Sequence, residues 1–291
     1  MKALIIGINS QDGIYLKQIL GKKEFQVFGI SRSDGNWIKG SVADFTFIEK
    51  TIAELKPDLI FHLAANSTTR HEALFENHET ISTGTLNVLE SVKKHSPKTK
   101  VFITGSGIQF RNNGIPIHET HEFEANCAYS ISRIQSVYAA RYFRSLGIKT
   151  YVGYLFHHES PYRKDTHISK FTTNFLKQLS FESGAKLSLG DITVRKEWAF
   201  AGDIAEGIFE LINQDVVFEA CIGTGNAYSI EDWLKECFEL KGLNYKDFIQ
   251  PPDKSFKAEY QLLVSNPATM KKIGWEAKTT FNDLARIMCN S

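Results

Sequence analysis

The chain has 291 residues, of which 42% are hydrophobic and 23% charged, as is typical of a globular protein with a substantial core. Its net charge of +1 makes a nucleic-acid-binding surface unexpected, and no stretch of about 18 apolar residues predicts a membrane span. The four cysteines lie far apart, and no signal-peptide pattern precedes the first apolar run. These features favour a cytoplasmic protein with reduced thiols. The spacing of the histidines predicts no metal site.

Short apolar runs alternate with amphipathic stretches along the first 156 residues. The expected strands are 3–7, 25–30, 58–64, 100–105 and 149–156, and the expected helices between them are 14–22, 47–56, 79–94 and 128–147. This alternation predicts an α/β fold, a Rossmann-type doubly wound parallel sheet. Further helices are expected at 170–182, 203–213 and 230–241. We expect a dinucleotide-binding core over 1–156 and a small, mainly substrate-binding α/β lobe over 157–291, from which about 189–225 return to the core.

The stretch GINSQDG (7–13) joins the first expected strand to the first helix. A phosphate-binding turn needs one glycine for the tight bend and another where the helix packs closely on the strand. Gly7 and Gly13 stand at these places, while Ser10 occupies the middle position, where it could crowd the pyrophosphate or donate a hydrogen bond to it. We therefore expect a dinucleotide site that includes Gln11 and Asp12. A plain strand-to-helix turn is the alternative.

The second expected strand is followed by Ser31 and Arg32, with no acidic residue at that strand end. NAD sites usually place a carboxylate there for the ribose 2′-hydroxyl, whereas a 2′-phosphate prefers arginine. The sequence therefore favours NADP(H) over NAD(H). A solvated surface arginine is the alternative interpretation.

A serine and a tyrosine in the middle of the chain are the candidate catalytic pair. Ser106 ends the fourth expected strand, and Tyr129 lies near the start of a helix in AYSISR (128–133). Both hydroxyls could reach one carbonyl oxygen above a nicotinamide ring, where hydride transfer is coupled to proton transfer. A fixed cation near the tyrosine would favour the phenolate. Arg133 supplies this charge where a lysine is usual, through a bulkier and more diffuse group. An ordinary i, i+4 helix pair is the alternative.

With these motifs in this order, the chain resembles the extended short-chain dehydrogenase/reductase family. Within the family it is similar to the branch that contains GDP-mannose 4,6-dehydratases and GDP-4-keto-6-deoxymannose reductases. The resemblance runs nearly from end to end. It is carried by GINSQDG, KPDLIFHLAANS (56–67), LFHHESP (155–161), LGDITVRKEWAFAGDIAEGI (189–208), IGTGNAYSIEDW (222–233) and NPATMKKIGWEAKTTFNDL (266–284). It implies a nucleotide-sugar ligand, more specifically a GDP-sugar.

The resemblance also implies roles for single residues. Ala64, Ala65 and Phe156 would lie against the cofactor. Four residues would contact the substrate: Lys170 and Lys196 near the diphosphate, Glu259 near the nucleoside ribose, and His157 in place of an asparagine of the dehydratases. Lys196 itself replaces an arginine of those enzymes.

One departure bears on the reaction. The dehydratases carry a glutamate two residues after the catalytic hydroxyl, where it takes the sugar C5 proton, but this chain has Ile108, which accepts no proton. We therefore expect an NADP(H)-dependent ketoreductase or dehydrogenase acting at C4 of a GDP-linked hexose. One alternative is a 4,6-dehydratase whose base is Glu119, Glu122 or His118. The other is a catalytically silent nucleotide-sugar-binding protein.

The segments 72–95 and 126–146 are expected to form long helices. The resemblance implies that two subunits pair through these helices as a homodimer. Leu86, Val137 and Phe143 could form the seam between them, although core packing explains these positions nearly as well.

Overall fold

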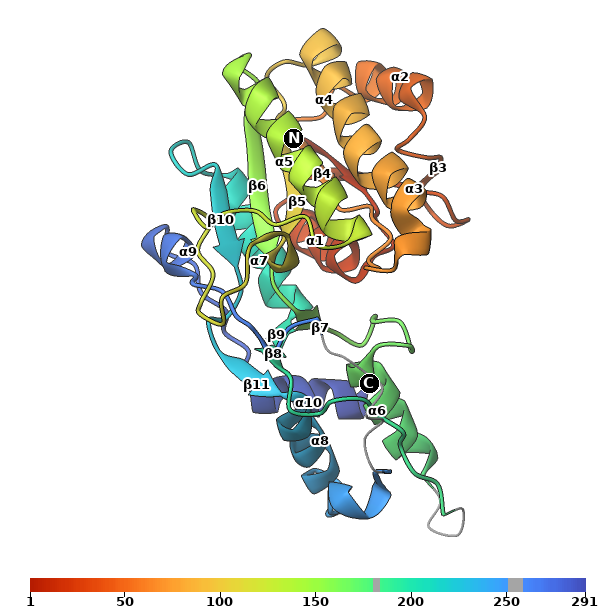
Figure 1. Ribbon diagram of the computed structural model, residues 1–291. Helices are drawn as coiled ribbons and strands as arrows, with labels where there is room; N and C mark the ends of the chain where they lie inside the picture. Colours follow the sequence, from red (N-terminus) through yellow and green to blue (C-terminus); the bar gives the residue numbers. More distant parts are fainter. Residues whose placement is uncertain (180–183, 251–258) are drawn as a thin grey trace.

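The computed structural model describes residues 1–179, 184–250 and 259–291 (Figure 1). Within them, the main sheet has seven parallel strands in the order β10-β6-β5-β4-β1-β2-β3. Their bounds are β1 Lys2–Ile6, β2 Gln26–Ser31, β3 Ile38–Lys39, β4 Leu59–His62, β5 Lys100–Ser106, β6 Thr150–Leu155 and β10 Glu219–Ile222. This topology confirms the predicted Rossmann-type fold.

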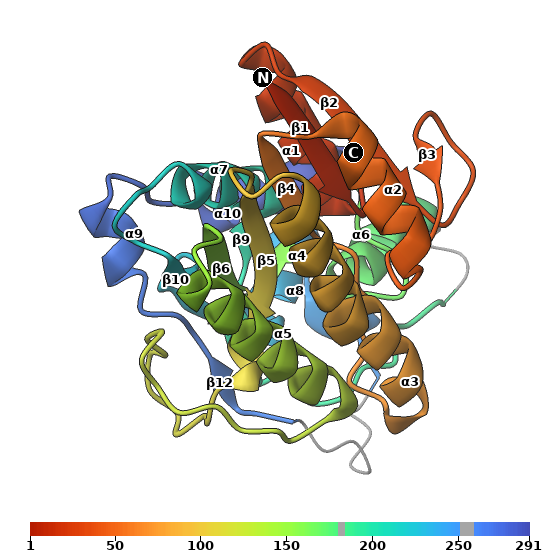
Figure 2. The same cartoon turned by 90° about the horizontal axis from the view of Figure 1, so that it is seen from above.

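Helices cover both faces of the sheet, as Figure 2 shows from above. One face carries α2 (Phe45–Leu55), α4 (Gly84–His95) and α5 (Ala128–Ser145), and the other carries α1 (Gln11–Lys22) and α7 (Ala201–Ile212). Successive side chains of a strand point to opposite faces. In β1, Leu4 and Ile6 therefore join the first core, while Ala3 and Ile5 join the second. Each face buries a separate apolar cluster, which holds the carboxyl ends of the strands in fixed positions.

The predicted long helix over 72–95 is wrong in detail, because the chain forms four successive helical pieces. They are η1 (His71–Ala73), α3 (Leu74–Asn77), the π-helical turn η2 (His78–Thr83) and α4. The π-helical turn leads into Gly84, where a Cβ atom would lie 2.8 Å from Val42 Cγ1 and 3.2 Å from His62 Nε2. The wider turn thus brings the backbone unusually close to the sheet edge. The second segment begins at Ala128, with Cys127 as its N-cap.

Two residues expected at a subunit seam belong to the core instead. Val137 is fully buried and Phe143 is 5% exposed, because both point from α5 toward the sheet. Leu86 does lie on the surface. The outward side of α5 instead carries Tyr138 and Tyr142, each more than half exposed.

A second lobe lies below the main sheet in Figure 1. A three-stranded sheet is formed by β8 (Arg195–Glu197), β11 (Ala227–Ser229) and β12 (Leu262–Leu263), and β7 (His158–Glu159) pairs with β9 (Ala199–Phe200). Its core stacks Trp198 on Trp233 at 4.6 Å between ring centroids. The remaining helices are η3 (Gly107–Gln109), α6 (Ile168–Gln178), α8 (Ile230–Glu239), η4 (Tyr245–Phe248), α9 (Ala268–Lys272) and α10 (Phe281–Asn290).

Parts of the stretch 189–225 do lie in the main sheet and on its face, as β10 and α7. The predicted helix 170–182 corresponds to α6, and its residues 180–182 lie outside the described residues. In the described part of the chain, the helices are all too short or too polar to cross a membrane.

Candidate active site

The turn after β1 depends on two glycines for close backbone contacts. Gly7 has a positive φ of 92°, and a Cβ atom there would lie 2.8 Å from the Ala64 nitrogen. At Gly13, a Cβ atom would lie 2.5 Å from the Gly7 carbonyl oxygen. Ser10 caps α1, since its Oγ accepts a hydrogen bond from the Gly13 N–H at 3.0 Å. The Ser10 hydroxyl therefore keeps its own proton available for donation to a ligand.

A cavity of about 330 Å³ opens at the carboxyl ends of β1, β2 and β4, the edge at which open α/β sheets bind ligands. It is lined by small and polar residues, among them Gly7, Asn9, Ser10, Ser31, Arg32, Ser33, Ser41, Ala64, Ala65, Thr80 and Lys164. The turn residues, both alanines and the residues after β2 thus share one cavity, which we call the dinucleotide cavity. Its small residues leave room for a flat cofactor, and its position beside the N-terminus of α1 suits a pyrophosphate.

Arg32 stands at the rim of this cavity and is paired with an acidic residue. Its Nη2 lies 3.0 Å from Glu76 Oε1, and the other carboxylate oxygen accepts a hydrogen bond from Asn66 at 2.7 Å. The bond from Arg32 lowers the pKa of Glu76, so the carboxylate is ionised at neutral pH. Arg32 therefore lies at the cavity, but a phosphate that bound it would have to share its guanidinium with Glu76.

Tyr129 and Arg133 meet at the start of α5. The guanidinium carbon of Arg133 lies 4.9 Å from the centroid of the Tyr129 ring, and its Nη1 donates to the Thr104 carbonyl at 2.5 Å. Arg133 is only 3% exposed. Ser106 ends β5, the strand that holds Arg133 through Thr104. The structure thus places a buried cation against the tyrosine ring, fixed to the strand that carries the serine.

His62 is a neighbour of Arg133 that the sequence did not single out. It ends β4 and is 2% exposed. Burial, followed by the charge of Arg133, lowers the pKa of His62 to about 3. His62 is therefore neutral at physiological pH, and it adds no second positive charge beside Arg133.

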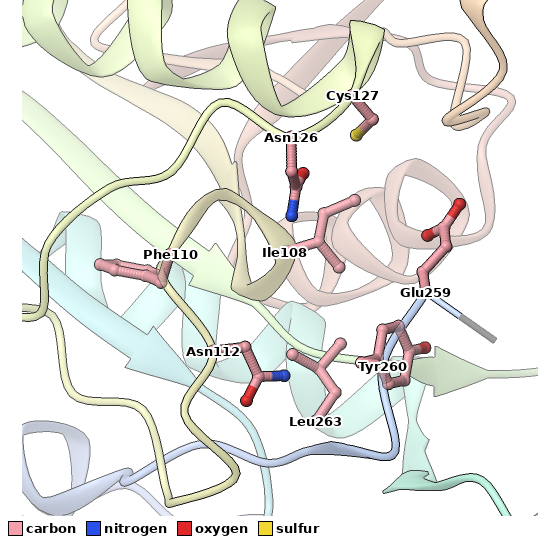
Figure 3. A pocket seen from close by; sticks show the side chains of 8 residues that line it. All are labelled: Ile108, Phe110, Asn112, Asn126, Cys127, Glu259, Tyr260 and Leu263. Carbon is pink, nitrogen blue, oxygen red and sulfur yellow. The ribbon is translucent and has the colours of Figure 1, made fainter.

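A second cavity, of about 220 Å³, lies beside the start of α5 (Figure 3). It is lined by Ile108, Phe110, Asn112, Asn126, Cys127, Glu259, Tyr260 and Leu263. In Figure 3, Asn126 and Cys127 come from the segment that leads into α5, Ile108 from η3, and Glu259 and Tyr260 from the segment that leads to β12. Glu259 also accepts a hydrogen bond from Thr69 Oγ1 at 2.6 Å. This cavity, the Ile108 cavity, therefore lies between the main sheet and the second lobe.

The three bases considered as replacements for the missing glutamate lie elsewhere. Glu119 accepts hydrogen bonds from the Thr269 hydroxyl and the Cys221 N–H, and His118 Nε2 lies 3.4 Å from the same carboxylate. Glu122 is paired with Arg111 on the surface. Among the described residues that line the Ile108 cavity, Glu259 is the carboxylate.

A buried group of charged side chains follows β6, and we call it the Glu159 cluster. Glu159 is fully buried, with His157 Nε2 at 2.8 Å from one oxygen and Arg163 Nε at 3.4 Å from the other. His157 also bonds the Glu197 carbonyl through Nδ1 at 2.7 Å. Lys196 is 9% exposed, and its ammonium lies 5.0 Å from the centre of a Trp198 ring.

The charges of the Glu159 cluster follow from its burial. Burial lowers the pKa of Lys196 to about 8. Burial would raise the pKa of Glu159, but His157 and Arg163 outweigh it, so that pKa lies below its usual range. His157 meets two acceptors, the Glu197 carbonyl and the Glu159 carboxylate, so both of its ring nitrogens carry a proton when Glu159 is ionised. The Glu159 carboxylate therefore faces His157, Arg163 and Lys196 together. The excess positive charge suits an anionic ligand.

Side chains of the turn after β1 connect the dinucleotide cavity with the segment that carries the Glu159 cluster. Gln11 donates to the His158 carbonyl at 3.3 Å and accepts from Ser160 Oγ at 2.9 Å. Asp12 lies 2.9 Å from His158 Nε2. These side chains, expected at the cofactor, thus also hold the segment after β6. No local pattern signals these contacts, because the paired residues lie almost 150 positions apart.

A family model described as GDP-mannose 4,6 dehydratase matches residues 4–288, nearly the whole chain. The chain belongs to the GDP-mannose 4,6-dehydratase family. Curated relatives include GDP-mannose 4,6 dehydratase 2 of Arabidopsis thaliana, 29% identical over 98% of this chain and 85% of the relative. A GDP-mannose 4,6-dehydratase of Vibrio cholerae is 26% identical, and the match covers 99% of this chain and 92% of the Vibrio cholerae protein.

Solved structures agree with this membership at the level of the fold. The UDP-glucose 4-epimerase of Thermotoga maritima superposes with a TM-score of 0.88 at 18% identity, over 100% of this chain and 98% of the other. The dTDP-glucose 4,6-dehydratase of Bacillus anthracis, in complex with NAD, superposes with a TM-score of 0.87 at 19% identity. The superposition covers 100% of this chain and 96% of the other. RMD from Pseudomonas aeruginosa, complexed with NADPH, superposes with a TM-score of 0.82 at 18% sequence identity. The superposition covers 100% of this chain and 98% of the other.

The remaining predicted site residues of this dehydratase-family chain lie in different surroundings. His157 and Lys196 are brought together in the Glu159 cluster, and Lys170 lies half-buried on α6, next to the buried Ser169. Phe156 is 2% exposed and packs on Gly107 in the core, and it is not one of the residues that line the dinucleotide cavity.

Glu159 and Arg163 were not predicted as site residues, although they stand four positions apart in the turn-rich HHESPYR stretch. Asn126 and Cys127, which precede the tyrosine motif and line the Ile108 cavity, were not predicted either.

Proposed function

We propose that the protein is an NADP(H)-dependent ketoreductase or dehydrogenase that acts at C4 of a GDP-linked hexose. The observation that carries the proposal is Ile108, which lines the cavity beside the tyrosine-bearing helix. A side chain without a proton acceptor at this place cannot take a proton from sugar C5, so elimination of water lacks its base. Oxidation or reduction at C4 needs only a proton exchange at the oxygen and a hydride partner.

Tyr129 would exchange the proton with the C4 oxygen, and Ser106 would orient that oxygen by a hydrogen bond. Arg133 would position the tyrosine, because its buried guanidinium lies 4.9 Å from the centre of the ring and is fixed to the Thr104 carbonyl. Bound NADP(H) would supply or accept the hydride. The residues of the dinucleotide cavity fit such a cofactor, since Gly7 and Gly13 keep the turn open next to the N-terminus of α1.

The substrate would bind mainly through residues 157–291. Lys196 and Arg163 would attract the diphosphate, with Lys170 as a further cation on α6. Glu259 would accept hydrogen bonds from the nucleoside ribose near the Ile108 cavity. The names of the curated relatives, which refer to GDP-mannose, support guanosine diphosphate as the carrier of the sugar.

A panel of GDP-sugars and their 4-keto derivatives tests the proposal when NADPH absorbance and product mass are followed together. We expect NADPH consumption that matches the gain of two hydrogens by a 4-keto substrate. Tyr129→Phe should lower kcat by about 10²- to 10⁴-fold, the usual contribution of an acid–base group, and should leave cofactor bound. Tyr138→Phe, on the exposed side of the same helix, is the matched control. A Tyr129→Phe enzyme as fast as the parent would refute the assignment.

Two variants of Arg133 separate its charge from its shape. Arg133→Lys should keep or raise the activity, because it retains a cation beside the tyrosine. Arg133→Ala should lose both activity and cofactor affinity. If no sugar in the panel reacts while cofactor remains bound, the protein is a silent nucleotide-sugar-binding protein instead.

A 4,6-dehydratase is the second candidate function, because the carboxylate of Glu259 lines the same cavity as Ile108. It could accept a C5 proton from a suitably placed sugar. This reaction would release water from GDP-mannose with no net change in NADPH absorbance. A product lighter by one water, absent in Glu259→Gln, would favour this candidate over the reductase.

A further inference from the structure

The dinucleotide cavity contains a second cation besides Arg32. Lys164 lies in the loop after β7 and lines the cavity together with Ser31, Arg32 and Ser33. It comes from the other half of the chain, more than 130 positions after Arg32. A cation here stands beside the residues that follow β2, the place where the ribose of a bound dinucleotide is recognised.

The loop that carries Lys164 is held at both sides. Ser160 Oγ donates to Gln11 at 2.9 Å, and the Arg163 N–H donates to the Ser160 carbonyl at 2.9 Å. Arg163 and His167 meet at 3.0 Å, and Arg163 also contacts Glu159. Adjacent residues of one fixed loop thus serve two sites: Arg163 belongs to the Glu159 cluster, while Lys164 belongs to the dinucleotide cavity.

The surroundings of Lys164 offer what a phosphate dianion needs. The hydroxyls of Ser31 and Ser33 lie 3.2 Å apart, and Asn9 donates to Ser33 at 3.1 Å. Arg32 adds a guanidinium at the rim. Hydroxyl donors combined with cations are the usual partners of phosphate oxygens, whereas a ribose hydroxyl gains little from a second cation.

The two cations differ in how free they are. Arg32 is engaged by Glu76 at 3.0 Å, so a phosphate that binds Arg32 competes with a carboxylate. In the described part of the chain, the Lys164 ammonium forms no direct ion pair or hydrogen bond, and it acts on Glu76 only through its charge, as a smaller cause of the lowered pKa of that carboxyl than Arg32 is. We propose that Lys164 is the principal cation for the 2′-phosphate of NADP(H), ahead of Arg32. This inference rests on the cofactor choice in the proposed function.

Calorimetric titration of the purified full-length protein with NADP⁺ and with NAD⁺ tests the proposal. We expect Lys164→Ala to weaken NADP⁺ binding by about tenfold, the loss typical of a charge-assisted contact, and to change NAD⁺ binding by less than about twofold. Arg32→Ala should weaken NADP⁺ binding by a smaller factor. Lys164→Arg should retain most of the affinity, and Lys93→Ala, an exposed lysine on α4, is the control.

The outcomes separate this inference from the proposed function. If the parent binds NADP⁺ more tightly than NAD⁺ and Lys164→Ala binds both like the parent, Lys164 has no such role, while the cofactor choice stands. Equal losses for both cofactors would also overturn the inference, because they would indicate a general effect on the cavity. If the parent itself binds NAD⁺ more tightly, the choice of NADP(H) fails, and the inference fails with it.

Discussion

The dinucleotide cavity and the Glu159 cluster lie next to each other but are built in opposite ways. The cavity is formed by a turn and small residues, its charged residues Arg32 and Lys164 are exposed, and Glu76, the partner of Arg32, is 43% exposed. In the cluster, Glu159 is fully buried and Lys196 nearly so, and its members come from segments some 40 residues apart. The first site depends on backbone shape, whereas the second depends on paired charges away from water.

This difference indicates where each site should be sensitive. A site made of close backbone contacts should fail when a side chain is added. A site made of buried charges should fail when one partner loses its charge, because the remaining charge is then left without compensation. Exposed charges, by contrast, contribute little to folding.

The largest effect is expected in the cluster. Glu159→Gln should lower the free energy of unfolding by about 3–5 kcal/mol, because it leaves Arg163 and Lys196 without their buried counter-charge. Glu76→Gln, which removes the exposed partner of Arg32, should lower it by less than about 1 kcal/mol. Urea unfolding of both variants measures the comparison. Equal losses would show that the two regions do not differ in this way.

In the cavity, added volume should matter more than charge. Gly13→Ala should weaken NADP⁺ binding by more than about tenfold, since the new Cβ would lie 2.5 Å from a backbone oxygen and force the helix away from the turn. Gly21→Ala, in the same helix, has open space around its Cβ and is the control. It should leave binding unchanged and stabilise the fold by about 0.5–1 kcal/mol. Unchanged cofactor affinity in Gly13→Ala would contradict the described turn.

A smaller effect is expected for ligand binding at the cluster. Lys196→Ala should weaken GDP binding by about tenfold, while exposed Lys241→Ala should not change it. Because burial lowers the pKa of Lys196 to about 8, GDP binding to the parent should also weaken as the pH rises from about 7 to about 9. Glu159 stays ionised over this range. A pH-independent affinity, measured by calorimetry, would place the diphosphate elsewhere.

The smallest effect on either site is expected from the outer surface of α5, which belongs to neither. Tyr138 and Tyr142 are 58% and 59% exposed and stand four residues apart on one side of the helix. We expect the parent to be a homodimer that pairs through this helix and α4. The double variant Tyr138→Glu, Tyr142→Glu should be monomeric by light scattering and should bind NADP⁺ like the parent. A monomeric parent at micromolar concentration would end this prediction.

The sequence by itself determined the elements whose signals are local. Alternating apolar runs predicted the order of strands and helices, and the glycine spacing after β1 located the dinucleotide turn, because both depend on neighbouring residues. The same holds for Tyr129 and Arg133, which one turn of helix brings together. The π-helical turn before Gly84 was not predicted, and the Gly84 backbone beside it lies close to Val42 and His62, which come from distant segments.

Only the tertiary structure decided which charges are buried and which residues share a site. The position of Gln11 and Asp12 in the turn predicts a role at the cofactor, and only the structure shows that their side chains also bond His158 and Ser160, because the sheet places the end of β6 beside the start of α1. Lys164 reached the dinucleotide cavity by the same juxtaposition. The physical reason is that charge and hydrogen-bond partners act over a few ångströms in space, a distance on which sequence separation places no limit.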